Sequence, residues 1–247
     1  MRQFQKILIM DTVNLFLNPI WIFFSIGFPV IAALILGFLT SGSYGNTVSS
    51  YDYYGVAILF FAISNTSMLS ANSFMEERIK SPNLRIIYSP VRSFCIHFSK
   101  VAATFIFSSV SCTIAAAILR ITLNVNYGGY LAWAPFVIML FSNFFFSALG
   151  VLVCCFFKSE SIANQVVSPI TGIFCLLGGV FFPVDGLGRA VFAISWFSPV
   201  KWMLTACMEI IYDRNFALFL PALGMLAGLS IVAVFLSARL FKGEEYL

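Results

Sequence analysis

The sequence predicts an all-α integral membrane protein with six transmembrane helices. Hydrophobic residues make up 60% of the 247 residues and charged residues only 10%, whereas a soluble domain carries roughly 25% charged residues. The apolar residues gather into six runs, and each is about as long as the ~20 residues that cross a bilayer. The runs lie at 19–39, 53–75, 94–119, 131–157, 162–182 and 216–240. No strand-length alternation recurs, so we expect one transmembrane domain, 1–247, and no barrel.

The residues before the first run predict a helix that lies at the membrane surface. Phe4, Ile7, Leu8 and Leu15 recur at nearly helical spacing, and polar residues stand between them. The alternative is a simple flank of the first span. No small-residue cleavage site follows a short apolar core, so we expect the first span to be retained.

The distribution of basic residues predicts that both termini are cytoplasmic. With the amino end inside, ten of the 14 lysines and arginines fall inside, and only Arg120, Arg189, Lys201 and Arg214 fall outside. This is the positive-inside pattern of membrane proteins. The net charge of +4 then reflects topology and contact with lipid headgroups, and a nucleic-acid partner is not expected.

The six cysteines and the one histidine do not form a recognisable site. The cysteines show no CxxC pair, and His97 has no nearby carboxylate or cysteine ligand set. We therefore expect neither a disulfide framework nor a metal site. An intramembrane enzyme also lacks a plausible nucleophile and base.

The segment 76–100 joins the second and third runs and carries five basic residues in an otherwise charge-poor chain. Ser81 followed by Pro82 is typical of a helix start. Leu84, Ile87 and Tyr88 then share one helical face, and Pro90 disfavours continuation. The pattern predicts a short amphipathic helix, 82–88, on the cytoplasmic surface, suited to meeting a partner. The alternative is a charged inside loop without a docking role.

The segment between the fifth and sixth runs is too apolar for an ordinary solvated loop. Pro183, Gly186 and Gly188 interrupt helical structure, and the aromatic residues suit a membrane interface. We expect re-entrant helical pieces over 183–212. The alternative is a seventh span, 191–211, which would bury charged residues and move the carboxyl end outside.

Polar residues concentrate in the second and fifth runs, where they are costly and usually face a bundle interior or a water-filled path. The candidates for a substrate path are Asn65, Met68, Asn72, Asn164, Gln165, Ser168 and Thr171. Small residues such as Ser64, Ser67 and Ala71 equally fit a close packing seam between helices. No charged residue lies at the centre of a run, so an ion-coupled carrier has no evident relay.

The chain resembles the permease subunits of ABC-2 type ATP-binding-cassette transporters, most closely bacterial efflux permeases of the drug, antibiotic-resistance and sodium-export kind. The resemblance covers nearly the full length. It is carried by three stretches: FLNPIWIFFSIGFPVIAALILGF, FMEERIKSPNLRIIYSPVRSFCIHFSK and GGVFFPVDGLGRAVFAISWFSPVKW.

The resemblance implies two further sets of functional residues. Coupling to an ATPase subunit would fall to Glu76, Glu77, Arg78, Lys80, Leu84, Arg85, Ile87 and Tyr88. An outer gate would comprise Phe181, Phe182, Pro183, Trp196, Pro199 and Trp202.

The resemblance also implies partners and a location. It implies separate ATPase subunits that bind ATP and magnesium, a second permease that is identical or paralogous, and a bacterial cell membrane with its lipids. The chain has no GxxxxGK[ST] phosphate loop, so we expect it to be no enzyme and to bind no cofactor itself.

The expected function is ATP-driven export of a hydrophobic or amphiphilic substrate, such as an antibiotic or drug. Two alternatives stay open. One is export of a polysaccharide, another glycan or a lipid, and the other is a non-transporting immunity or sensor subunit.

Overall fold

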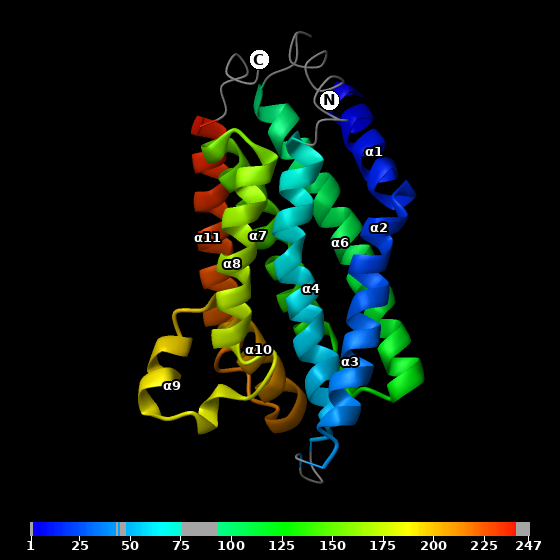
Figure 1. Ribbon diagram of the computed structural model, residues 1–247, viewed down its shortest axis with the longest axis vertical. Helices are drawn as coiled ribbons and strands as arrows, with labels where there is room; N and C mark the ends of the chain where they lie inside the picture. Colours follow the sequence, from blue (N-terminus) through cyan, green and yellow to red (C-terminus); the bar gives the residue numbers. More distant parts are fainter. Residues whose placement is uncertain (1, 43, 45–47, 76–92, 241–247) are drawn as a thin grey trace.

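A computed structural model describes residues 2–42, 44, 48–75 and 93–240 (Figure 1). The described part is helical and contains no strand. The long helices are α1 (Arg2–Leu17), α3 (Phe28–Leu39), α4 (Ser50–Met75), α6 (Ser93–Leu123), α7 (Trp133–Phe157), α8 (Glu160–Gly178) and α11 (Phe219–Leu240). Shorter pieces are α2 (Pro19–Ile22), α9 (Arg189–Ser195), α10 (Pro199–Met208), the π-helices η1 (Phe23–Gly27) and η4 (Glu209–Asp213), and the 3₁₀ turns η2 (Gly129–Leu131) and η3 (Val184–Gly186).

The predicted six spans are confirmed. Helices long and apolar enough to cross a membrane cover Pro19–Leu39, Ser50–Phe74, Phe98–Leu123, Gly129–Phe157, Glu160–Gly178 and Phe219–Leu240. The fifth span ends four residues before its predicted end at 182, because Gly179 adopts a left-handed φ of +84° that closes the helix.

The described chain begins and ends at the same end of the bundle (Figure 1). We call this the termini end, and it also holds the last turn of α4 and the first turn of α6. The opposite end, which holds the first turn of α4 together with α9 and α10, is called the far end.

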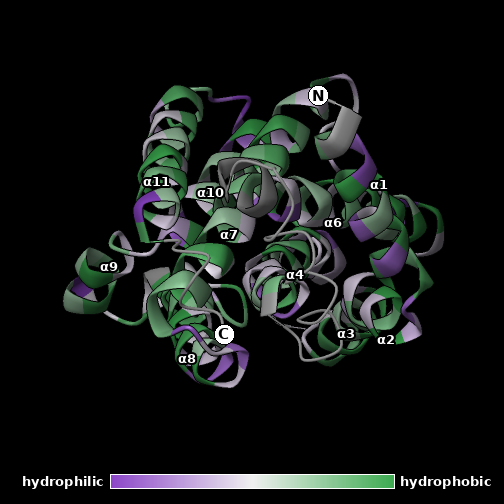
Figure 2. Cartoon of the chain, turned by 90° about the horizontal axis from the view of Figure 1, so that it is seen from above, coloured by the Kyte–Doolittle hydropathy of each residue, from purple (hydrophilic) through white to green (hydrophobic). Residues whose placement is uncertain are grey.

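The spans form two rows around α4. Viewed from above, α8, α4 and the first span make one row, and α11, α7 and α6 make the other (Figure 2). Helix α4 contacts α3, α6, α7 and α8. It is the most enclosed span, since 78% of its most apolar window is buried against 17% for the first span and 28% for α8.

The contact between α4 and α7 depends on a glycine. A Cβ atom added at Gly150 would stand 2.0 Å from the backbone oxygen of Ser67. Only glycine permits this approach, as is common where membrane helices pack closely. The approach holds the central helix against the second row.

The segment before the last span folds back on itself as predicted. The helical pieces Arg189–Ser195 and Pro199–Asp213 are bent by 99° relative to each other. Both α8 and α11 meet this pair at the far end (Figure 1). This bend fits the predicted re-entrant pair.

The predicted N-terminal helix is present as α1, which packs along α6. Asn18 separates it from the first span. The Asn18 side chain accepts a hydrogen bond from the Ile20 N–H at 3.1 Å, and Pro19 occupies the first helical position. This is a new helix start, so α1 and α2 are distinct helices.

Candidate substrate path and outer gate

A furrow runs between the first span and α4. One stretch has a volume of about 460 Å³ and is lined by Ile20, Trp21, Phe24, Ser25, Phe28, Phe61, Ala62, Asn65, Thr66, Met68 and Leu69. A second stretch of about 310 Å³ is lined by Phe28, Ile31, Ala32, Ile35, Leu36, Ile58, Phe61 and Phe181. The two stretches meet at Phe28 and Phe61, and we call them together the α3–α4 furrow.

The lining is almost entirely apolar. The second stretch has no polar side chain, and the first has only the short hydroxyls of Ser25 and Thr66, the amide of Asn65 and the indole N–H of Trp21. Apolar walls with a few placed polar groups are typical of sites for small organic ligands. The furrow suits a molecule with a large apolar body and a small polar group.

A π-helical turn forms part of the furrow wall. Within η1 the chain makes a wider turn, and the Phe28 N–H that follows it donates to the Phe23 oxygen. Phe24 and Ser25 of this turn line the furrow. π-turns inside α-helices are rare and often stand at functional sites, because they redirect side chains and can be rearranged to α-helix.

Three predicted path residues lie on the half-open face of α4. Asn65 and Met68 line the furrow, and Asn65 Nδ2 also donates to the Phe61 oxygen at 2.9 Å. Asn72 follows two turns later and is half-buried. Asn72 contacts the other neighbour of α4 in this row, helix α8, rather than the first span.

A hydrogen bond joins the predicted polar residues of α4 to those of α8. Asn164 Nδ2 of α8 donates to Asn72 Oδ1 of α4. Thr171 is buried but donates to the Val167 oxygen of its own helix at 3.0 Å. Gln165 and Ser168 are exposed on the outside of α8. Of the seven predicted path residues, two line the furrow, two bond to each other, two are exposed and one is buried: Asn65 and Met68, Asn72 and Asn164, Gln165 and Ser168, and Thr171.

The packing alternative describes another face of α4. Ser64, Ser67 and Ala71 are all fully buried. Ser67 lies against Gly150, and Cys154 Sγ of α7 approaches the Ala71 oxygen at 3.7 Å. Ser67 and Ala71 thus lie in the seam between α4 and α7, while the amide side chains occupy the opposite, half-open face.

Two tyrosines fasten the residues that follow α8 to the far end of α4. Tyr53 donates its hydroxyl to the Gly179 oxygen, and Tyr54 donates to the Phe181 oxygen at 2.8 Å. Phe181 in turn packs edge-on against Phe61, with ring centroids 5.4 Å apart. Phe181, which the resemblance assigns to an outer gate, thus lines the second stretch of the furrow.

The other predicted gate residues lie around the re-entrant bend. Trp202 Nε1 donates to the Trp196 oxygen at 2.8 Å, and the two indole rings meet edge-on at 5.0 Å. Pro199 is buried at the start of α10, whereas Phe182 and Pro183 are exposed. None of these five lines the furrow.

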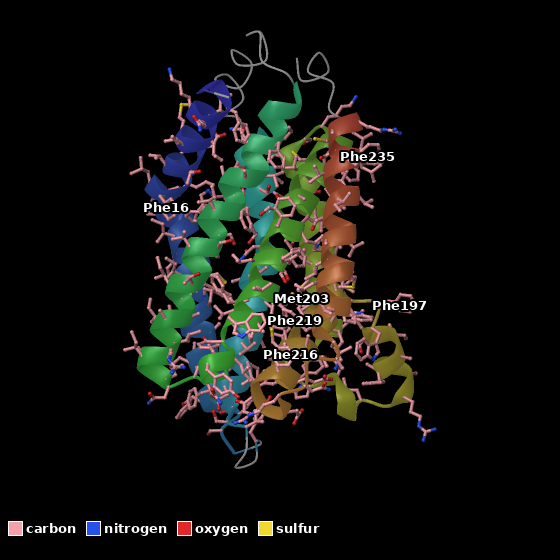
Figure 3. All side chains as sticks on the ribbon, turned by 180° about the vertical axis from the view of Figure 1, so that it is seen from behind. Phe16, Phe197, Met203, Phe216, Phe219 and Phe235 are labelled. Carbon is pink, nitrogen blue, oxygen red and sulfur yellow. The ribbon has the colours of Figure 1, made fainter. Side chains whose placement is uncertain are left out.

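The apolar surface of the bend faces outward. Phe197 follows α9 and is 85% exposed, and Figure 3 shows it at the margin of the molecule. An exposed ring beside the ends of the spans suits the interfacial region of a bilayer, where aromatic residues gather. The bend therefore presents an apolar surface.

A third tyrosine completes the far end. The Tyr44 ring lies 5.6 Å from the Tyr53 ring and 6.0 Å from the Tyr54 ring. Burial raises the pKa of the Tyr44 phenol, and Tyr54 reinforces that rise. Tyr44 is therefore neutral at physiological pH.

The predicted residue sets did not include Tyr53, Tyr54, Phe28 or Phe61. The run YDYYG at the start of the second span was a usable signal, because tyrosines at a span end commonly sit at the interface and donate hydrogen bonds. Phe28 and Phe61 had no such signal among 29 phenylalanines.

The predicted coupling helix, 82–88, lies outside the described residues. The same holds for all eight residues assigned to ATPase coupling: Glu76, Glu77, Arg78, Lys80, Leu84, Arg85, Ile87 and Tyr88. The described helices that flank this segment, α4 and α6, are in contact.

The family model described as ABC-2 type transporter matches residues 2–212, which include five of the six spans and the re-entrant bend. No curated protein matches the chain.

Proposed function

The chain belongs to the ABC-2 type transporter family, and on this basis we propose that it is the permease subunit of an ATP-driven exporter for hydrophobic or amphiphilic molecules. The coarser statement, a membrane permease component of an ABC transporter, follows from the family. The observation that carries the finer proposal is the α3–α4 furrow, an apolar channel along the central helix that ends at Phe181.

The substrate class follows from the lining of the furrow. A sugar chain needs many hydrogen-bond partners, because burying hydroxyl groups without them costs about 1–3 kcal/mol each in proteins. The furrow offers one amide, two hydroxyls and one indole N–H. An amphiphile with one small polar group matches this lining, and a polysaccharide does not.

A second permease would cover the row that contains α8, α4 and the first span. The first span and α8 are the two least enclosed of the neighbours of α4. Gln165 and Ser168 lie exposed on α8, although polar side chains within a span are disfavoured against lipid. A second copy or a paralogue packed on this row would shelter them and enclose the furrow.

The ATPase subunit would bind at the termini end. Residues 76–92 join α4 to α6 there, and their basic and amphipathic pattern favours the cytoplasmic side. ATP and magnesium would belong to that subunit. Closure of the ATPase pair would then push on the ends of α4 and α6 and change the width of the furrow.

The test begins with purification of this chain from its native membrane in mild detergent. We expect an ATPase subunit to copurify, and ATP turnover to rise when a small amphiphile such as a cationic dye is added. The triple substitution L84A/R85A/I87A should abolish this stimulation while membrane insertion is retained. A matched control, L220A/I231A/V232A, changes three residues of α11 that are exposed or half-exposed, and it should leave activity unchanged.

Two results would overturn the proposal. A chain that purifies alone, without ATPase activity in its native membrane, would support an immunity or sensor subunit. A complex whose ATPase responds to glycans and not to amphiphiles would support glycan export.

A further inference from the structure

A buried ion pair joins α1 to α6 at the termini end. Lys100 Nζ lies 2.6 Å from Asp11 Oδ1, and the two side chains are 1% and 6% exposed. Burial raises the pKa of the Asp11 carboxyl, and the Lys100 ammonium opposes that rise.

The pair lies near the start of α6. That helix follows residues 76–92, which the resemblance assigns to ATPase coupling and which we call the coupling segment. Residues 76–92 lead directly into α6, and Lys100 is the eighth residue of that helix. Thr104 donates to the Lys100 oxygen at 2.9 Å, and its hydroxyl lies 3.3 Å from that of Ser73 in α4. The helices on both sides of the coupling segment are thus linked to α1 at one level.

From α1 the connection continues into the furrow wall. Asn18 and Pro19 join α1 to the first span without a loop, and η1 begins at Phe23. The same turn, η1, contacts α6 and lines the furrow. A movement of α1 together with α6, relative to α4, would therefore move the wall that carries Phe24 and Ser25.

We propose that Asp11 and Lys100 are positioning residues that make α1 move together with α6, so that a push on the coupling segment changes the width of the α3–α4 furrow. Buried charges are costly, and a pair persists only where each charge compensates the other. Packing alone would need no charges at this contact. Asp11 Oδ2 is buried and has no partner among the described residues, so the carboxylate relies on Lys100. This inference rests on the proposed transport function.

The first experiment measures transport per ATP hydrolysed in the reconstituted complex. The variants are D11N, K100M, the double variant and the exchanged pair D11K/K100D. The single variants should lower the ratio by about tenfold, because each leaves one buried charge without its partner, and the exchanged pair should recover most of it. Thr12→Val, next to Asp11 and bonded only within its own helix, is the matched control and should keep the ratio.

The second experiment does not depend on transport. Spin labels at Ile9 of α1 and Ile106 of α6, both exposed, report the distance between the helices. The distance distribution should be narrow with and without nucleotide in the unchanged pair and should broaden in D11N. A distribution that stays narrow in D11N, or a transport ratio unchanged in both single variants, would overturn the proposal. A complex that does not transport but shows the broadening would contradict the proposed function and leave the α1–α6 connection supported.

Discussion

Phe61 of α4 and Phe181, which follows α8, meet edge-on, with ring centroids 5.4 Å apart and planes at 65°. Phe61 belongs to both stretches of the α3–α4 furrow, and Phe181 to the far stretch alone. Because the Tyr54 hydroxyl holds the Phe181 oxygen, the same helix both lines the furrow and fixes its closure. Movement of α4 would therefore move the furrow lining and Phe181 together.

The Tyr54 hydroxyl provides a test of this closure. Tyr54→Phe removes the hydrogen bond to Phe181 and keeps the ring, and a net loss of about 1 kcal/mol corresponds to roughly a fivefold shift toward an open gate. The measurement is the rate at which a membrane-impermeant thiol reagent modifies Phe181→Cys. We expect this rate to rise about fivefold, and Tyr130→Phe, a change at an exposed tyrosine, to leave it unaltered. Equal rates in both variants would contradict the role of Tyr54.

Filling the furrow should stop transport without harming assembly. Met68→Trp adds a bulky ring to the first stretch, which is about 460 Å³ in volume. We expect amphiphile-stimulated ATPase activity to fall at least about tenfold, while basal activity and copurification of the ATPase subunit persist. Ile231→Trp on the exposed side of α11 is the control. Normal stimulation in Met68→Trp would show that substrate passes elsewhere.

The α4–α7 seam predicts a difference between two glycines. Gly150→Ala places a methyl group against the Ser67 backbone and should lower stability by about 1–3 kcal/mol. Gly172→Ala in α8 meets no atom within 4 Å and should be neutral or stabilising by up to about 1 kcal/mol. Thermal unfolding of the purified chain in detergent compares the two. Similar melting temperatures would contradict the close approach.

The hydrogen bond between Asn72 of α4 and Asn164 of α8 should contribute modestly to the free energy of unfolding. Asn72→Ala, Asn164→Ala and the double variant form a cycle that isolates the hydrogen bond between them. Interhelical hydrogen bonds in membranes average about 0.6 kcal/mol and reach about 1.7. We expect a coupling energy in this range from unfolding measurements. Additive effects of the two substitutions would mean that the pair does not hold the helices together.

The six spans and the outer bend were predictable because each depends on local sequence. An apolar run of span length needs a helix to satisfy its backbone in lipid, and Pro199 starts a new helix wherever α10 lies. The furrow and the ion pair depend on contacts between distant residues. Asp11 and Lys100 are 89 positions apart, and no feature of either segment names the other as its partner.

The half-open face of α4 was predictable only in part. The spacing of seven between Asn65 and Asn72 correctly indicated one face, but the sequence did not indicate which helices would flank it. The two amides have different surroundings: Asn65 lines the furrow that η1 also lines, and Asn72 bonds to Asn164 of α8. The π-turn itself had no evident signal in FFSIG, because a wider turn needs no special residue.

The most direct test of the central claim is ATP-driven transport of a fluorescent amphiphile by the complete complex in vesicles, compared between the natural chain and Asn65→Trp. The account predicts that ATP drives accumulation in vesicles carrying the natural chain, and that the Asn65→Trp complex hydrolyses ATP at its basal rate without accumulation. Undiminished accumulation by Asn65→Trp would contradict the assignment of the α3–α4 furrow as the substrate path.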